Sequence, residues 1–105
     1  MSAAGQPASS APQVTVRVPT ILRAYTGGAS TVTVDAGTGC SVGDLITRLE
    51  SEYPGIRARV LDEAGQIRRF VNVYVDDEDV RFGEGLQTAV APGTTLSIIP
   101  AVAGG

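Results

Sequence analysis

One segment with helical periodicity, Ser41 to Tyr53, stands among short segments in which valine alternates with polar residues. Ser41 is a favourable N-cap, and Asp44 is placed three residues later to complete a capping box. Pro54-Gly55 ends the segment, and its apolar residues recur at helical spacing: Val42, Leu45, Ile46 and Leu49. A lone amphipathic helix must bury its apolar face against another layer. The pattern therefore predicts one helix packed on one face of a sheet.

The first two strands of this sheet are predicted before the helix. Valine alternates with polar residues from Gln13 to Val18, and the same alternation returns from Thr31 to Asp35. Pro19 and the Gly27-Gly28 pair separate the two segments. The arrangement is typical of a hairpin with a long loop.

The remaining elements are predicted after the helix. Ile56 to Leu61 has the length of a short second helical turn, and Arg69 to Val75 is the clearest strand of the chain. Asp76 to Asp79 is expected to form a turn, followed by a short return strand over Val80 to Phe82. Leu96 to Ile99 is the final strand.

The order of these elements predicts an α+β fold of the β-grasp type, a mixed sheet covered by one main helix. In this layout the first and last strands commonly pair side by side in the middle of the sheet. The chain has 105 residues, which suffices for one domain. We expect that domain over residues 13–100, a disordered N-terminal tail of small and polar residues over 1–12, and a flexible C-terminal tail over 101–105.

Alternation in the last strands assigns their side chains to two faces. The face toward the helix is expected to take five aliphatic residues: Val71, Val73, Val75, Leu96 and Ile98. Phe70, Tyr74 and Ile99 then fall on the opposite, exposed face. Exposed aromatics beside an aliphatic residue often mark a docking patch, and we predict one here. The alternative is that loops cover one or two of the three side chains.

Composition excludes several classes of function. Histidine is absent, which removes the commonest general base and the commonest metal ligand, so neither an enzyme nor a metal site is expected. The net charge of -3 argues against nucleic-acid binding. No apolar run approaches a membrane span, and the N-terminal segment does not resemble a signal peptide. We therefore expect a cytoplasmic protein with no membrane association.

Three further features have a functional and a plain interpretation. Cys40 precedes the helix N-cap, where a thiolate would be somewhat stabilised and could hold a persulfide; a small apolar residue at the start of a helix is the favoured interpretation. The acids of Asp76 to Asp79 lack the alternate spacing of a calcium loop, which favours a solvated turn. Arg68 and Arg69 could contact an acidic partner or simply be solvated where the strand begins.

The chain resembles the ThiS/MoaD group of sulfur carriers, which are relatives of ubiquitin. Three stretches carry the resemblance: VPTILRAYTGG (18–28), RFVNVYVDDEDVRF (69–82) and IIPAVAGG (98–105). Within that group they look most like the carriers that serve bacterial cysteine biosynthesis. A terminal Gly-Gly is a weak motif alone, because the chain has 13 glycines, but it is specific after this order of strands.

The resemblance implies how such a chain would work. Gly105 would carry sulfur as a thiocarboxylate formed through an acyl-adenylate, while Gly104 and Ala103 would give access to a narrow channel, since glycine permits close backbone approach. The implied partners are an E1-like adenylating and sulfurtransferase enzyme and a pyridoxal-phosphate-dependent cysteine synthase, or another sulfur-acceptor enzyme. ATP and pyridoxal phosphate would belong to these partners, with no cofactor bound by the carrier itself.

Other functions share the same tail. The chain could be the small subunit of molybdopterin synthase, or a carrier for thiamin or for a sulfur-containing metabolite. It could also be a ubiquitin-like protein modifier, although all of its basic residues are arginines, so it cannot form chains on its own lysines. A β-grasp binding module with an idle tail is the third alternative.

Overall fold

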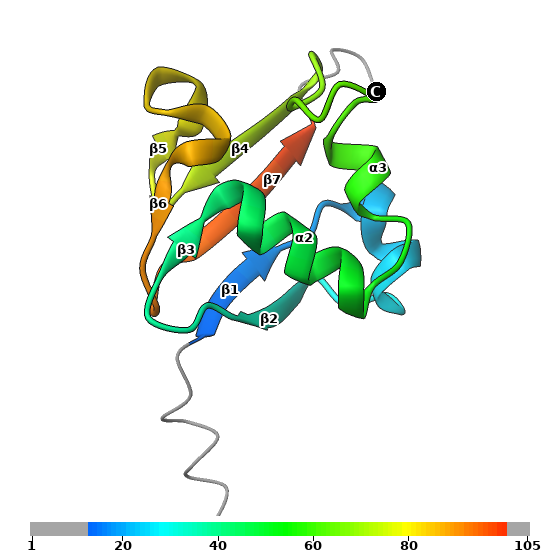
Figure 1. Cartoon of the computed structure of the whole chain (residues 1–105). Helices are drawn as coiled ribbons and strands as arrows, with labels where there is room; N and C mark the ends of the chain where they lie inside the picture. Colours follow the sequence, from blue (N-terminus) through cyan, green and yellow to red (C-terminus); the bar gives the residue numbers. More distant parts are fainter. Residues whose placement is uncertain (1–12, 101–105) are drawn as a thin grey trace, which may run out of the picture.

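The computed structural model describes residues 13–100, which form a five-stranded sheet with one long helix across it (Figure 1). The strand order is β2-β1-β7-β4-β5. The bounds are β1 Gln13–Arg17, β2 Thr31–Asp35, β4 Val71–Val75, β5 Glu78–Asp79 and β7 Thr95–Pro100. The tails predicted over 1–12 and 101–105 lie outside the described residues.

The first and last strands are neighbours at the centre of the sheet. β1 pairs with β7 in parallel, while β2 pairs with β1 and β4 pairs with β7 in antiparallel fashion. The sheet is therefore mixed, and its long helix covers one face, which confirms the predicted β-grasp arrangement.

The long helix, α2 (Val42–Glu52), begins where the sequence predicts it. Its capping box is complete: the Asp44 amide donates to Ser41 Oγ at 3.1 Å, and the Ser41 amide donates to Asp44 Oδ2 at 3.4 Å. The four apolar residues predicted to face the sheet are buried. Tyr53 is the C-cap, immediately before Pro54-Gly55.

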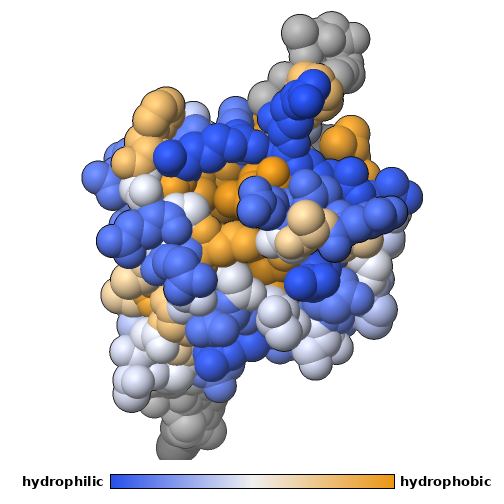
Figure 2. All heavy atoms as spheres, turned by 45° about the horizontal axis from the view of Figure 1, so that its top comes forward, coloured by the Kyte–Doolittle hydropathy of each residue, from blue (hydrophilic) through white to orange (hydrophobic). Residues whose placement is uncertain are grey.

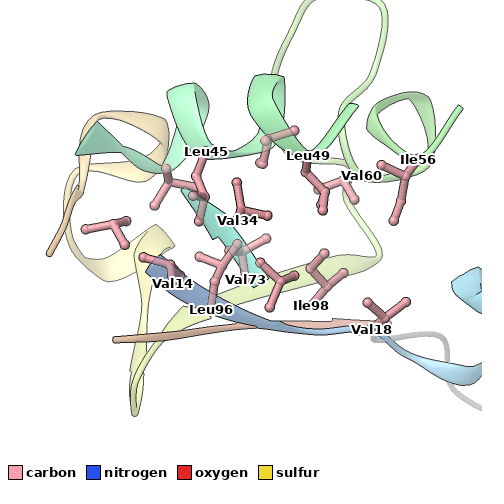
Figure 3. Close-up of a cluster of buried hydrophobic side chains, with 14 of the residues drawn as sticks. Val14, Val18, Val34, Leu45, Leu49, Ile56, Val60, Val73, Leu96 and Ile98 are labelled. Carbon is pink, nitrogen blue, oxygen red and sulfur yellow. The ribbon is translucent and has the colours of Figure 1, made fainter. Parts of the chain in front are cut away.

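The core lies between α2 and the inner face of the sheet (Figure 3). Leu45 and Leu49 of the helix point toward Val73, Leu96 and Ile98 of the central strands, and all five side chains are buried. The inward face of β4 and β7 is thus the one predicted, although Val71 and Val75 are only partly buried, near the ends of β4.

Short elements complete the chain. The loop between β1 and β2 contains a 3-10 helix, and the second helical turn forms as predicted. The bounds are η1 Thr20–Thr26, α3 Arg57–Val60, η2 Val80–Phe82 and η3 Gly85–Gln87, with a small sheet of β3 Cys40–Ser41 and β6 Ala89–Val90. No helix among residues 13–100 is both long and apolar enough to cross a membrane.

Two predicted boundaries are wrong. The return strand is Glu78–Asp79, because Asp76 adopts a left-handed conformation (φ 54°) that reverses the chain at once. Val80–Phe82 is instead the 3-10 helix η2, which Asp79 caps by accepting from the Arg81 amide at 2.9 Å. The strand predicted from Arg69 begins at Val71, since Arg69 and Phe70 form a turn in which the Val71 amide donates to the Arg68 carbonyl.

The two faces of β7 give a direct test of the packing. Leu96→Ala should lower the free energy of unfolding by about 2–5 kcal/mol, because it leaves a cavity in the core. Ile99→Ala, three residues later on the outer face, should cost less than about 1 kcal/mol. Urea unfolding of both variants measures the difference, and equal losses would show that the two faces are assigned wrongly.

Candidate functional site

The predicted reactive residue Gly105, with Gly104 and Ala103, lies outside the described residues. The structure instead describes the strand from which these residues follow. β7 pairs with β1 over Thr95–Ser97 and with β4 from Leu96 onward, so Leu96 and Ser97 are paired on both sides, and the pairing with β4 continues to Pro100, which lies opposite Val71. The root of the tail is therefore held at the centre of the sheet.

A groove opens beside this root because β1 leaves the sheet before β7 ends. The parallel pairing stops at Arg17 opposite Ser97. The next amide, that of Val18, donates to the Ser30 carbonyl at 2.8 Å, and Pro19 has no N–H to offer. The last three residues of β7 are thus paired with β4 alone.

The resulting hollow has a volume of about 670 Å³. It is lined by the end of β1, the first residues of η1, the start of β2 and the last four residues of β7. We call it the root groove and define it by four side chains: Arg17, Ile21, Arg23 and Ile99. No carboxylate of the described residues lines it.

The outer wall of the root groove, η1, is fixed to the body of the protein. The Tyr25 hydroxyl accepts from Arg59 Nε of α3 at 2.7 Å, and the Tyr25 ring packs over Gly55 so closely that a Cβ at Gly55 would lie 2.8 Å from it. Thr26 Oγ1 donates to the Ala29 carbonyl at 2.8 Å, which closes the loop. The groove therefore has a rigid wall made from a segment that the sequence indicates only as a loop.

The four side chains that define the root groove differ in their hydrogen bonding and in their exposure to solvent. Arg23 Nε donates to the Val18 carbonyl at 3.1 Å, which holds its guanidinium against the wall, and Arg17 is exposed at the end of β1. Ile21 is 67% exposed and Ile99 45% exposed. The groove thus offers two cations and two aliphatic side chains to solvent.

The residues of the predicted docking patch are only partly brought together. Tyr74 lies opposite Ser97, and Ile99 opposite Asn72, so Tyr74 and Ile99 share the outer face as diagonal neighbours. Phe70 is 56% exposed in the turn before β4, with the guanidinium of Arg69 over its ring at 5.9 Å. Its docking role stays a prediction.

A polar contact interrupts this outer face. Arg81 of η2 donates to the Asn72 side chain at 2.6 Å and to the Arg68 carbonyl at 2.6 Å. The same guanidinium therefore joins η2 to the turn that precedes β4. Arg68 itself donates from Nε to the Ala58 carbonyl at 2.9 Å, which gives it a structural contact where the sequence left its role open.

A second hollow lies between the 64–67 loop and residues of η2 and η3. Figure 2 shows hydrophobic surface gathered near the centre of this view and framed by hydrophilic side chains. A hollow of about 470 Å³ is lined by Ile67, Arg81, Leu86 and neighbouring residues of the 64–67 loop. Ile67 and Leu86 pack partly against the core, so this hollow is mainly the place where two loops meet.

Cys40 does not have the environment of a reactive thiol. It is partly buried in β3, opposite Val90, and burial raises the pKa of its thiol above the ordinary value of 9.0. The expectation of a stabilised thiolate is therefore wrong in direction, because desolvation outweighs the attraction of Arg48. The structure agrees with the small apolar residue that we favour from the sequence.

The acidic run has a structural role in a turn. The Thr95 amide donates to Asp76 Oδ1 at 3.1 Å, and the Asp76 amide donates to the Thr95 carbonyl at 2.8 Å, so the turn is tied to the start of β7. Within residues 13–100, no three acidic or cysteine side chains are grouped so that they could hold a metal ion.

Two exposed apolar residues are absent from the sequence predictions. Ile21 follows Pro19 in a segment read as loop, and the only available signal is the Ile21-Leu22 pair, of which the structure buries Leu22 alone. Phe82 is 91% exposed in η2, a segment predicted as a strand that would have half-buried it.

Comparison with known proteins shows a matching family and several similar chains. The ThiS family matches residues 16–105 of the chain. The sulfur carrier protein CysO of Mycobacterium tuberculosis is 51% identical over 94 residues, covering 88% of this chain and 98% of the relative. Small archaeal modifier protein 1 of Haloferax volcanii is 33% identical over 82 residues, covering 78% of this chain and 90% of the relative.

A solved structure agrees with these sequence matches. One chain in the crystal structure of the Amycolatopsis orientalis BexX/CysO complex superimposes with a TM-score of 0.79, at 51% identity. The alignment covers 88% of this chain and 99% of that chain.

The environment of Cys40 predicts slow alkylation. At pH 7.5 iodoacetamide should modify Cys40 more slowly than the same residue in the urea-unfolded chain, because the raised pKa leaves less thiolate. The rate in the folded protein should continue to rise as the pH passes 9.0. Mass spectrometry of the alkylated chain measures both rates. Faster modification in the folded state would contradict the assignment of an unreactive thiol.

Proposed function

The chain belongs to the ThiS family and is a sulfur carrier of the CysO type, and from that premise we propose that Gly105 carries the sulfur as a C-terminal thiocarboxylate. Carriers of this type are small protein substrates and not enzymes. The observation that supports the proposal most is the position of β7. The central strand leads at Pro100 into the Ala-Val-Ala-Gly-Gly sequence, and the family match runs through Gly105.

The chemistry requires activation of the tail. A C-terminal carboxyl group has a pKa of about 3.3–3.7, so it is anionic at pH 7 and resists nucleophiles. We propose that its oxygen attacks the α-phosphorus of ATP and displaces pyrophosphate, giving an acyl-adenylate. Sulfide then attacks the carbonyl carbon and displaces AMP, which leaves the thiocarboxylate. If the terminal sulfur of a persulfide attacks instead, it displaces AMP to give an acyl disulfide, and a thiol then cleaves the S–S bond, releasing the thiocarboxylate and forming a disulfide with the former persulfide carrier. The nucleotide belongs to an adenylating partner of the E1 type.

The division between a fixed strand and a short tail suits this reaction. The partner must place one carbonyl beside a phosphate, and Gly104 and Gly105 permit the closest backbone approach. Strand pairing fixes the chain as far as Pro100, so the partner has to position only the residues that follow it, which keeps the entropic cost of binding low. No side chain of the carrier is assigned a catalytic step.

The sulfur is proposed to end in cysteine. The similarity to CysO supports this acceptor over molybdopterin or thiamin, and the acceptor enzyme would be a pyridoxal-phosphate enzyme that holds its own cofactor. We place the cycle in the cytoplasm, where a single free cysteine is stable.

A second candidate, a protein modifier, is favoured by the similarity to small archaeal modifier protein 1. In that case Gly105 would form an isopeptide bond to lysines of other proteins. Immunoblots of cell extract would show a ladder of conjugates that withstands thiol reagents. A carrier would show the free chain.

The proposed carrier chemistry predicts one change in mass. Incubation with an E1-type adenylating enzyme, ATP and sulfide should exchange one oxygen atom of the chain for sulfur, and fragmentation should locate the change on the last peptide. Deletion of Gly105 should abolish the exchange with no change in melting temperature, since residue 105 lies beyond β7. Cys40→Ser is the matched control and should react normally. Sulfur located on Cys40 would contradict the proposal.

The exposed turn residue Phe70 tests the proposed docking patch of Phe70, Tyr74 and Ile99. Phe70→Ala should raise the KM for the carrier in the adenylation reaction about tenfold, because an exposed aromatic anchor is lost, while kcat stays unchanged. Phe82→Ala removes a more exposed ring from η2 and serves as the control. Equal effects of the two substitutions would exclude a specific patch.

A further inference from the structure

We propose that the root groove docks an acidic protein surface, one that presents a carboxylate and an apolar side chain together, on the partner that handles Gly105. The inference deepens the proposed function by naming the chemistry of the partner, and it needs only that some enzyme acts on the tail. It rests on the place of the groove, its exposed aliphatic side chains and its charge.

The place of the groove follows from the reach of the tail. Five residues follow Pro100, and a fully extended chain spans at most about 3.6 Å per residue, or roughly 18 Å. A catalytic centre that holds Gly105 therefore lies within that distance of the end of β7. The body of such an enzyme must then approach the surfaces next to Pro100, and the root groove is one of them.

The exposed aliphatic groups of the groove are held in place. Ile21 is 67% exposed on η1, the wall that Tyr25, Arg59 and Thr26 fix to the body. Ile99 is 45% exposed on β7, opposite Asn72 in the ladder with β4. Rigid apolar side chains bind with little loss of conformational entropy, so they are suited to act as anchors.

The charge of the groove decides the chemistry of the partner. Arg17 and Arg23 line it, and no carboxylate of the described residues is part of its lining, although Arg17 also borders an adjoining hollow that Asp76 and Asp77 line and the whole chain carries a net charge of -3. Guanidinium groups pair with carboxylates in bidentate geometry, and a hydrophobic setting strengthens the pair. A nucleic acid is disfavoured by the net negative charge. A protein surface with acidic and apolar side chains could pair its carboxylates with the two arginines of the groove and pack its apolar side chains on the two isoleucines.

Isothermal titration of the full chain with Amycolatopsis orientalis BexX tests the proposal, because BexX is named in a complex with CysO. Binding is measured without ATP or sulfide, at 50 and 300 mM NaCl. Arg17→Glu should weaken binding about tenfold or more at low salt and less at high salt, since screening reduces the contribution of ion pairs. Ile21→Ala should weaken it about tenfold at both salt concentrations.

Two controls match these substitutions. Arg57→Glu makes the same change in net charge on α3, outside the groove, and Phe82→Ala removes another exposed apolar side chain. Both should change the affinity less than about twofold. Equal weakening by Arg57→Glu and Arg17→Glu would overturn the proposal, as would unaltered binding of the groove variants or no measurable binding of the unmodified chain.

Other occupants give different results. If the chain's own tail filled the groove, Arg17→Glu would release it and strengthen binding to BexX. If a second copy filled it, sedimentation of the free chain would show a dimer that Ile21→Ala dissociates. Either result would overturn the proposal. The titration is independent of sulfur transfer, so a carrier that docks through the groove but gains no sulfur would refute only the proposed function of Gly105.

Discussion

The parallel pairing of β1 with β7 is the interaction on which the rest of the structure depends. It joins residues 15–17 to residues 95–97 and so brings the two ends of the described chain together at the centre of the sheet. β2 and β4 then add to the two outer sides, and α2 packs across the face that results. Pairs so distant in sequence are costly in loop-closure entropy, and burial of Val16 and Leu96 against the helix offsets that cost.

β7 connects stability with the proposed function. Its inward residues, Leu96 and Ile98, belong to the core, while Ile99 is exposed and the strand ends where the carrier tail begins. The proposed function requires a tail that enters another protein and a domain that stays folded while it does so. β7 combines core residues with an exposed residue in one strand, because alternation sends successive side chains to opposite faces.

The root groove arises from a mismatch in strand length. β1 stops at Arg17, where the chain turns through Pro19 into η1, while β7 continues to Pro100. The gap leaves Arg17 and Arg23 beside Ile21 and Ile99, a combination of charge and apolar surface that none of the separate segments suggests. Cys40 is of a residue type that suggests a nucleophile, but burial raises the pKa of its thiol and so disfavours the reactive thiolate.

The sequence by itself determined the elements whose signals are local: the capping box of α2, the alternating valines of β1 and β2, the inward face of the last strand and the resemblance to sulfur carriers in the terminal glycines. Its errors lie where distant contacts decide the outcome. Asp76 reverses the chain early because Thr95 binds it from 19 residues away, and Arg81 closes the turn before β4 through Asn72 and Arg68. The groove likewise joins β1, η1, β2 and β7. Only the tertiary structure could place these residues together, because local propensity acts within a few residues and says nothing about which segments later become neighbours.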